Sequence, residues 1–241
     1  MKPLIKTVSW VTVFSIAMGF METVVVVYLR KIYYPAGFQF PLVAMENDMV
    51  IIEILREAAT IIMLLGIGYL AGKTTSQKFA FFILAFAIWD ICYYLFLKLL
   101  LNWPESLFTW DILFLIPVPW VGPVIAPCMV SLKMIVLTLS ILYFKELGIN
   151  TQIKPKEWIL LTFGSLTVIV SFIWDFFKYF SQEHTSSKAF NLTGKNVEIM
   201  NYIPGDFNWW IFIVGQLTII SGIIIYILRM QKEANHSTRN V

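Results

Sequence analysis

The sequence predicts an all-α integral membrane protein with six transmembrane helices. Hydrophobic residues make up 59% of the 241 positions and charged residues only 14%, and the mean hydropathy is +0.75. Soluble domains carry about 25% charged residues, so a chain this apolar belongs in a bilayer. Six apolar stretches reach the roughly 20 residues that a helix needs to cross the hydrocarbon layer. Within a single domain, 1–241, they cover residues 7–28, 49–71, 79–101, 122–144, 158–180 and 209–228.

We interpret the first stretch as a retained helix and not as a cleaved signal peptide. Lys2 and Lys6 precede it, as basic residues precede the apolar region of a signal peptide. The run is too long for such a region, however, and it contains Glu22 without a clear small-x-small cleavage motif. Continuous apolar runs at 24–27 and 223–225 argue against a β-barrel, in which polarity alternates along each strand.

Basic residues in the connections predict that both termini lie in the cytoplasm. This orientation follows the positive-inside bias. We expect the membrane to be the plasma membrane of a prokaryotic cell. A seventh crossing at 107–120 would reverse every later helix and weaken the bias, so we reject it. The segment 181–208 is then an outer loop and 229–241 a cytoplasmic tail. The cytoplasmic basic residues are Lys2, Lys6, Lys73, Lys78, Lys145, Lys154, Lys156, Arg229, Lys232 and Arg239; the outer ones are Arg30, Lys31, Lys188 and Lys195.

The stretch before the fourth helix is broken by proline. Prolines at positions 104, 117, 119, 123 and 127 lack a backbone N–H, so one continuous helix is excluded. We expect a half-helix over residues 105–116. It either lies along the outer interface, with tryptophans at headgroup level, or enters the membrane as a re-entrant segment that lines a site.

Charged residues lie inside the apolar stretches. A charge at membrane depth costs at least about 2.5 kcal/mol, so such residues are normally paired, directed toward the protein interior and functional. At about 1.5 Å per residue, most of the acids fall in the outer half of the membrane. We therefore expect a polar cavity that opens outward. The charged residues are Glu22, Glu53, Arg56, Glu57, Asp90, Lys133 and Asp175.

The second helix carries the densest cluster of charge. Glu53, Arg56, Glu57 and Thr60 are three and four residues apart, so they share one helix face and one guanidinium can bridge two carboxylates. This pattern fits an ionic clasp between helices, and it also fits an anion or proton site built around Arg56. The two roles are compatible.

The third and fourth helices add further polar groups at mid-depth. Asp90, Tyr93 and Tyr94 lie on one side of the third helix, where a phenol can hydrogen-bond the carboxylate. Lys133 is too deep to reach either interface, so it must lose its proton or meet a carboxylate. We expect Asp90 as its partner. Glu22 and the acids of the second helix are alternatives, as is a neutral lysine that contacts only helix backbone.

Several kinds of chemistry are disfavoured. The only histidines, His184 and His236, lie outside the apolar stretches, so haem, zinc and di-iron sites are not expected. The sequence contains no phosphate-binding loop and no nucleophile elbow. We expect no cofactor, no resident metal and no nucleic-acid partner, although a cation site made only of carboxylates remains open.

The sequence is compatible with three functions. The first is binding or transport of a small polar or anionic solute, or of a lipid headgroup, in a cavity built from Glu22, Glu53, Arg56, Glu57, Asp90, Tyr93, Tyr94 and Lys133. The second is an enzyme that acts on a lipid-like substrate with a carboxylate as acid or base. The third is an accessory subunit whose charges pair with a membrane protein partner. The sequence does not decide whether the chain is an enzyme.

Overall fold

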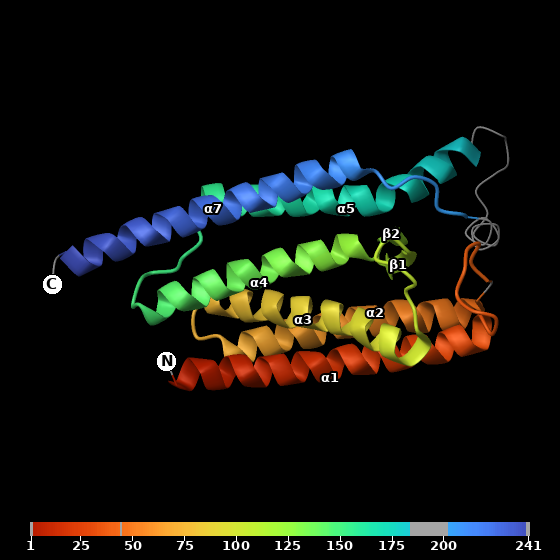
Figure 1. Ribbon diagram of the computed structural model, residues 1–241, viewed down its shortest axis with the longest axis horizontal. Helices are drawn as coiled ribbons and strands as arrows, with labels where there is room; N and C mark the ends of the chain where they lie inside the picture. Colours follow the sequence, from red (N-terminus) through yellow and green to blue (C-terminus); the bar gives the residue numbers. More distant parts are fainter. Residues whose placement is uncertain (1, 44, 184–201, 240–241) are drawn as a thin grey trace.

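The computed structural model describes residues 2–43, 45–183 and 202–239, and these residues form six helices and one short β-hairpin. Successive helices run in opposite directions along the long axis of the molecule (Figure 1). Both termini lie at one end, here called the terminal end, and the hairpin lies at the other, the hairpin end. The helices are α1 (Lys2–Tyr33), α2 (Asn47–Ala71), α3 (Thr75–Leu101), α4 (Ile125–Glu146), α5 (Pro155–Glu183) and α7 (Trp209–Arg239).

Five of these helices are long and apolar enough to cross a membrane. They are α1, α3, α4, α5 and α7. The remaining predicted crossing, 49–71, does form a helix, α2, but that helix carries Glu53, Arg56 and Glu57 and is not among the five. The all-helical membrane-type fold predicted from composition is thus found, with five clear membrane-length helices.

Helix α3 is the centre of the N-terminal half, because α1, α2 and α4 each pack mainly against it. Its small residues Ala80, Ala85 and Ala87 are fully buried, which lets neighbouring helices approach closely. On α1, Gly19 faces α3 so closely that an added Cβ would lie 2.9 Å from the Trp89 carbonyl oxygen. Glycine is therefore required where α1 crosses the polar half of α3.

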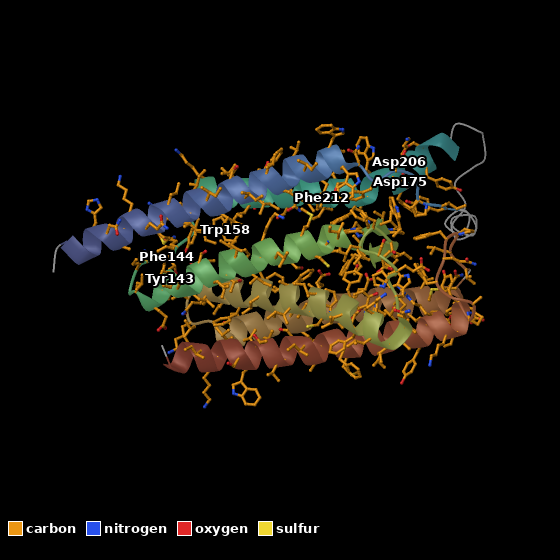
Figure 2. All side chains as sticks on the ribbon, viewed as in Figure 1. Tyr143, Phe144, Trp158, Asp175, Asp206 and Phe212 are labelled. Atoms are coloured by element: carbon orange, nitrogen blue, oxygen red, sulfur yellow. The ribbon has the colours of Figure 1, made fainter. Side chains whose placement is uncertain are left out.

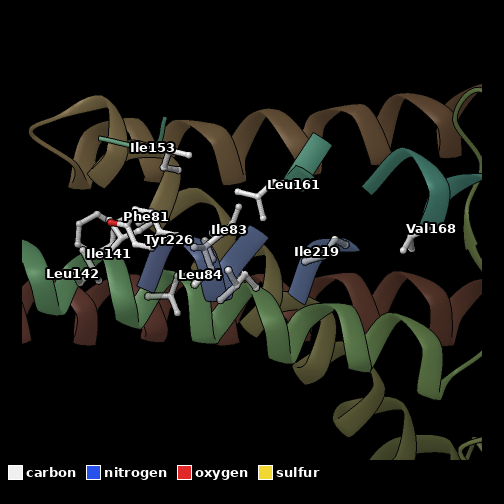
Figure 3. Close-up of a cluster of buried hydrophobic side chains, with 14 of the residues drawn as sticks. Phe81, Ile83, Leu84, Ile141, Leu142, Ile153, Leu161, Val168, Ile219 and Tyr226 are labelled. Carbon is white, nitrogen blue, oxygen red and sulfur yellow. The ribbon is translucent and has the colours of Figure 1, made fainter. Parts of the chain in front are cut away.

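Helices α5 and α7 form an antiparallel pair, and α4 lies between this pair and α1–α3 (Figure 1). Their backbones meet at Gly164, where an added Cβ would lie 2.9 Å from the Gly215 carbonyl oxygen. A continuous apolar core joins the pair to α3 and α4. Figure 3 shows part of this core, with side chains that include Ile83, Leu84, Ile141, Leu142, Leu161, Val168, Ile219 and Tyr226.

A buried ion pair fastens the α5/α7 pair at the terminal end. Arg229 on α7 donates to both carboxylate oxygens of Glu157 on α5, at 2.6 and 2.8 Å. The Glu157 side chain is only 2% exposed. The same guanidinium donates to Glu233 at 3.1 Å and to the Gln152 carbonyl oxygen at 2.9 Å, so it also holds the α4–α5 connection.

The predicted half-helix over residues 105–116 is wrong, because this region contains a β-hairpin. Strand β1 (Trp110–Phe114) pairs antiparallel with β2 (Trp120–Pro123), with Ile112 opposite Val121. The aromatic and β-branched side chains of the sequence Trp-Asp-Ile-Leu-Phe favour an extended backbone. Prolines at 117 and 119 then prevent a helix from continuing and form the turn. Consequently α4 begins at Ile125 and not at residue 122.

Helices extend into the predicted outer loop and the predicted tail, because α5 ends at Glu183 and α7 at Arg239. Helix α7 continues to Arg239, so most of the predicted tail 229–241 is the end of a helix. Residues 184–201 of the predicted outer loop lie outside the described residues. The last part of that loop is tied to α5, because the Tyr202 hydroxyl donates to Asp175 at 2.6 Å and the Gly205 N–H donates to it at 3.0 Å. Burial and this contact with a carboxylate raise the pKa of Tyr202.

Candidate functional site

A polar cavity of about 70 Å³ lies toward the hairpin end, where three helices meet the β-hairpin. Helices α1, α2 and α3 supply most of its wall, and β1 supplies the rest. A larger hollow near the end of α7 is lined by that helix alone and is therefore open surface. The polar cavity is lined by Glu22, Val26, Arg56, Glu57, Thr60, Trp89, Asp90, Tyr93, Tyr94, Ile112, Leu113 and Phe114.

Arg56 is neutralised by two carboxylates from different helices. Its Nε donates to Glu53 Oε2 on the same helix at 2.8 Å, one helical turn away. Its Nη1 donates to Glu22 on α1. The Thr60 hydroxyl also donates to Glu22, at 3.3 Å. The sequence predicted that one guanidinium bridges two carboxylates, and it does so here, but the bridge joins α1 to α2.

Two other carboxyl groups face the cavity without a cationic partner among the described residues. Glu57 Oε2 accepts a hydrogen bond from the Leu115 backbone N–H, which follows β1, at 2.9 Å. Asp90 Oδ2 accepts one from the Ser131 hydroxyl on α4, at 2.8 Å. Each carboxyl is thus held by a neutral donor from a neighbouring element.

The predicted pairing of Lys133 with Asp90 is wrong. Lys133 Nζ donates to the Met129 carbonyl oxygen, one turn earlier on α4, at 2.8 Å. It does not line the cavity. This is the arrangement expected for a lysine that contacts only helix backbone, and it removes Lys133 from the cavity's charge balance.

Aromatic side chains form much of the remaining wall. Trp89, Tyr93, Tyr94 and Phe114 all line the cavity, and the rings of Tyr93 and Tyr94 meet edge to face with centroids 4.9 Å apart. Trp89 is only 6% exposed. Its indole N–H is buried and has no hydrogen-bond partner among the described residues. Buried donors are normally satisfied, and this N–H shares its lack of a partner with buried polar atoms of Arg30, Asp111, Trp120 and Gln216.

A second buried ion pair attaches the hairpin to α1. Arg30 donates to Asp111 of β1 at 3.1 Å, and both side chains are below 10% exposed. The guanidinium lies 3.7 Å from the ring centroid of Trp103 and 4.4 Å from that of Phe38. Burial raises the pKa of Asp111 to about 6, although the nearby Arg30 charge lowers it in part. Arg30 was expected in an outer loop, and nothing in the sequence indicated this contact.

Most of the predicted site residues come together, though not all of them. Six of the eight line the cavity: Glu22, Arg56, Glu57, Asp90, Tyr93 and Tyr94. Glu53 contributes through Arg56, and Lys133 points elsewhere. Asp175 does not line the cavity. It lies near Asp206 and accepts hydrogen bonds from Tyr202 and Gly205 (Figure 2).

Trp89, Ser131 and the hairpin were not predicted from the sequence. A tryptophan next to a membrane-depth aspartate was a visible signal for the first. Nothing in the sequence pointed to Ser131. The aromatic and β-branched residues at 110–114 could have indicated the first strand of the hairpin.

The charge balance of the cluster is acidic. Glu22, Glu53, Glu57 and Asp90 provide four carboxyl groups against the single guanidinium of Arg56. Within the described residues, no group of three or more His, Cys, Asp or Glu side chains is arranged to hold a metal ion. Chemically, the cavity can take up protons or a small positively charged group.

No protein-family model matches this chain, and neither a curated protein nor a solved structure matches it.

Proposed function

We propose that this chain is a multi-pass membrane protein whose six helices all cross the bilayer, with both termini in the cytoplasm. Two observations support the six crossings, and the positive-inside bias of the basic residues supports the side of the termini. The helices alternate in direction (Figure 1), so α2 must return the chain between α1 and α3. Its charged face is turned inward, because Glu53 and Glu57 are buried while Ile51, Leu55 and Ile62 are exposed. The cavity then lies in the outer half of the membrane.

We further propose that the cavity binds a small polar solute of positive charge, as a binding protein or as a transporter of that solute. The observation that supports this most directly is that Glu57 and Asp90 line one cavity and neither has a cationic partner among the described residues. An uncompensated charge at this depth is costly, so each carboxyl group must hold a proton or share a bound cation.

The sign of this charge departs from the anionic solute or lipid headgroup expected from Arg56 and Lys133. Arg56 already donates to two carboxylates, and the Lys133 ammonium donates to backbone. Among the described residues, no guanidinium or ammonium group therefore remains for an anion in this cavity. The charged side chains are gathered around one cavity between helices. This favours a binding role over that of an accessory subunit, whose unpaired charges would face a partner protein on the outside of the helix bundle.

The test is a thermal-unfolding screen of the purified full chain in detergent, with small cations, neutral solutes and anions at one pH and ionic strength. We expect cations to raise the unfolding temperature. Glu57→Gln and Asp90→Asn should each reduce the response, and the double variant should abolish it. Glu105→Gln is the matched control, because Glu105 is an exposed acid outside the cavity near the same end. Stabilisation by anions alone, or an unchanged response in the double variant, contradicts the proposal.

A further inference from the structure

We infer that the terminal end of the helix bundle binds the headgroups of anionic phospholipids. This inference goes beyond the proposed function, because it concerns the opposite end of the molecule from the cavity and holds whatever the cavity binds. It rests on three features of the terminal end: an excess of basic side chains, acids that are already occupied, and exposed aromatic rings beside the lysines.

Basic side chains outnumber acidic ones at the terminal end. This end gathers the start of α1, the α2–α3 turn, the α4–α5 connection and the last turns of α7 (Figure 1). Five of the six helices are long and apolar enough to cross a membrane, so these segments meet the headgroup layer. Among the described side chains here, the basic ones are Lys6, Lys73, Lys78, Lys145, Lys154, Lys156, Arg229 and Lys232, and the acidic ones are Glu146, Glu157 and Glu233.

Two of the three acids are already occupied. Glu157 is buried and accepts two hydrogen bonds from Arg229. Glu233 accepts one from the same guanidinium at 3.1 Å, and the Lys154 ammonium lies 3.7 Å from it. The remaining lysines form no ion pair with any acid that the structure describes, so their charge faces outward. They are Lys6, Lys73, Lys78, Lys145, Lys156 and Lys232.

Aromatic rings place part of this charge at headgroup depth. Tyr69 is 65% exposed, and the Lys78 ammonium lies 3.5 Å from its ring centroid. Trp158 is 38% exposed and meets the Phe79 ring with centroids 4.8 Å apart, which brings the starts of α3 and α5 together. Lys78 and Lys156 are within two residues of this contact. Exposed tryptophan and tyrosine in a membrane protein lie at headgroup level, where lysine side chains extend toward the phosphates.

The partner that fits this surface is an anionic phospholipid. Clusters of four to eight basic residues next to membrane-spanning helices attract anionic headgroups, and each residue strengthens the binding. A zwitterionic headgroup carries a compensating cation and gains much less from the same lysines. A free phosphate ester carries the right charge, but it lacks the acyl chains that hold a headgroup beside the apolar helices.

The experiment measures thermal unfolding of the full chain in a neutral detergent. Dioleoyl phosphatidylglycerol, dioleoyl phosphatidylcholine or sodium glycerol phosphate is added at one pH and ionic strength. We expect only phosphatidylglycerol to raise the unfolding temperature, and added salt to weaken its effect by screening. Combining Lys73→Gln with Lys156→Gln should raise the half-maximal concentration of phosphatidylglycerol roughly 25-fold, at about fivefold for each basic residue.

The matched control combines Lys31→Gln with Lys178→Gln. These two lysines are equally exposed but lie toward the hairpin end, so their loss should change the half-maximal concentration by less than about twofold. The inference is overturned if the unmodified chain responds equally to the two lipids, a comparison that needs no variant to fold. It also fails if glycerol phosphate stabilises as well as phosphatidylglycerol, or if both double variants weaken the response alike. None of these outcomes affects the proposed function, which the cation screen tests separately.

Discussion

Replacing Arg56 with glutamine tests whether the bridge between α1 and α2 is an ionic clasp. The change removes the only cation that contacts Glu22 and Glu53 within the described residues. These two carboxylates are 10% and 7% exposed, and Arg56 itself is 21% exposed, so water screens them weakly. Removing one partner of a buried ion pair typically destabilises a protein by about 3–5 kcal/mol.

We expect a loss near the lower end of this range, about 3 kcal/mol, because one-fifth of the Arg56 side chain still reaches the surface. By the scaling for chains of 150–250 residues, this corresponds to a fall of roughly 6–12 °C in unfolding temperature. The assay is thermal unfolding in detergent, followed by tryptophan fluorescence.

The decisive variant also removes the charges that Arg56→Gln leaves behind. Adding Glu22→Gln and Glu53→Gln produces a neutral site, and replacing all members of a buried ion pair is often nearly neutral for stability. We expect the triple variant to recover most of the lost stability. The clasp interpretation is refuted if the triple variant is no more stable than Arg56→Gln, or if Arg56→Gln unfolds within about 1 °C of the wild type.

Three further predictions concern other parts of the fold. Burial raises the pKa of Asp111 from 3.8 to about 6, so the folded chain binds this proton more tightly than the unfolded chain. The free energy of unfolding should therefore fall as the pH rises from about 4 to about 6, and Asp111→Asn should flatten that slope in urea titrations at stepped pH. Arg229→Gln strands a buried carboxylate and should cost about 3 kcal/mol in the same titrations, whereas Lys232→Gln, at an exposed site one turn away, should change stability by less than about 0.5 kcal/mol. Gly164→Ala places a methyl group against backbone and should lower the unfolding temperature by an amount equivalent to about 1–3 kcal/mol; Gly66→Ala, which meets nothing within 4 Å, should leave it unchanged or raise it, and equal effects would contradict the close packing of α5 and α7.

The helices could be predicted from the sequence because their apolar runs are long and nearly uninterrupted. Burial in a bilayer demands about 20 apolar residues per crossing, and few other structures produce that pattern. The ends were less predictable. Helix α7 extends to Arg239 because polar residues continue a helix readily in water, where hydropathy gives no signal.

The site could be predicted in part, since the rise per residue gives depth but not direction around the helix axis. Glu22 and Arg56 were placed at similar depth, and they meet. Asp90 and Lys133 were also placed at similar depth, but Lys133 turns back to its own helix. Its direction depends on how α3 and α4 are rotated against each other, which side-chain packing decides. The hairpin was missed because proline was treated as the end of a helix and not as the turn of a sheet.

The Glu57 carboxyl group lines the cavity and also accepts a hydrogen bond from the Leu115 N–H, next to the hairpin strand β1. The hairpin covers the cavity partly by donating to Glu57 Oε2, and a charged carboxylate accepts such a bond more strongly than a neutral one. Any proton or cation that settles on Glu57 draws on the same negative charge. The strength of this hydrogen bond between the hairpin and α2 therefore depends on the charge that Glu57 carries, and a proton on Glu57 weakens it.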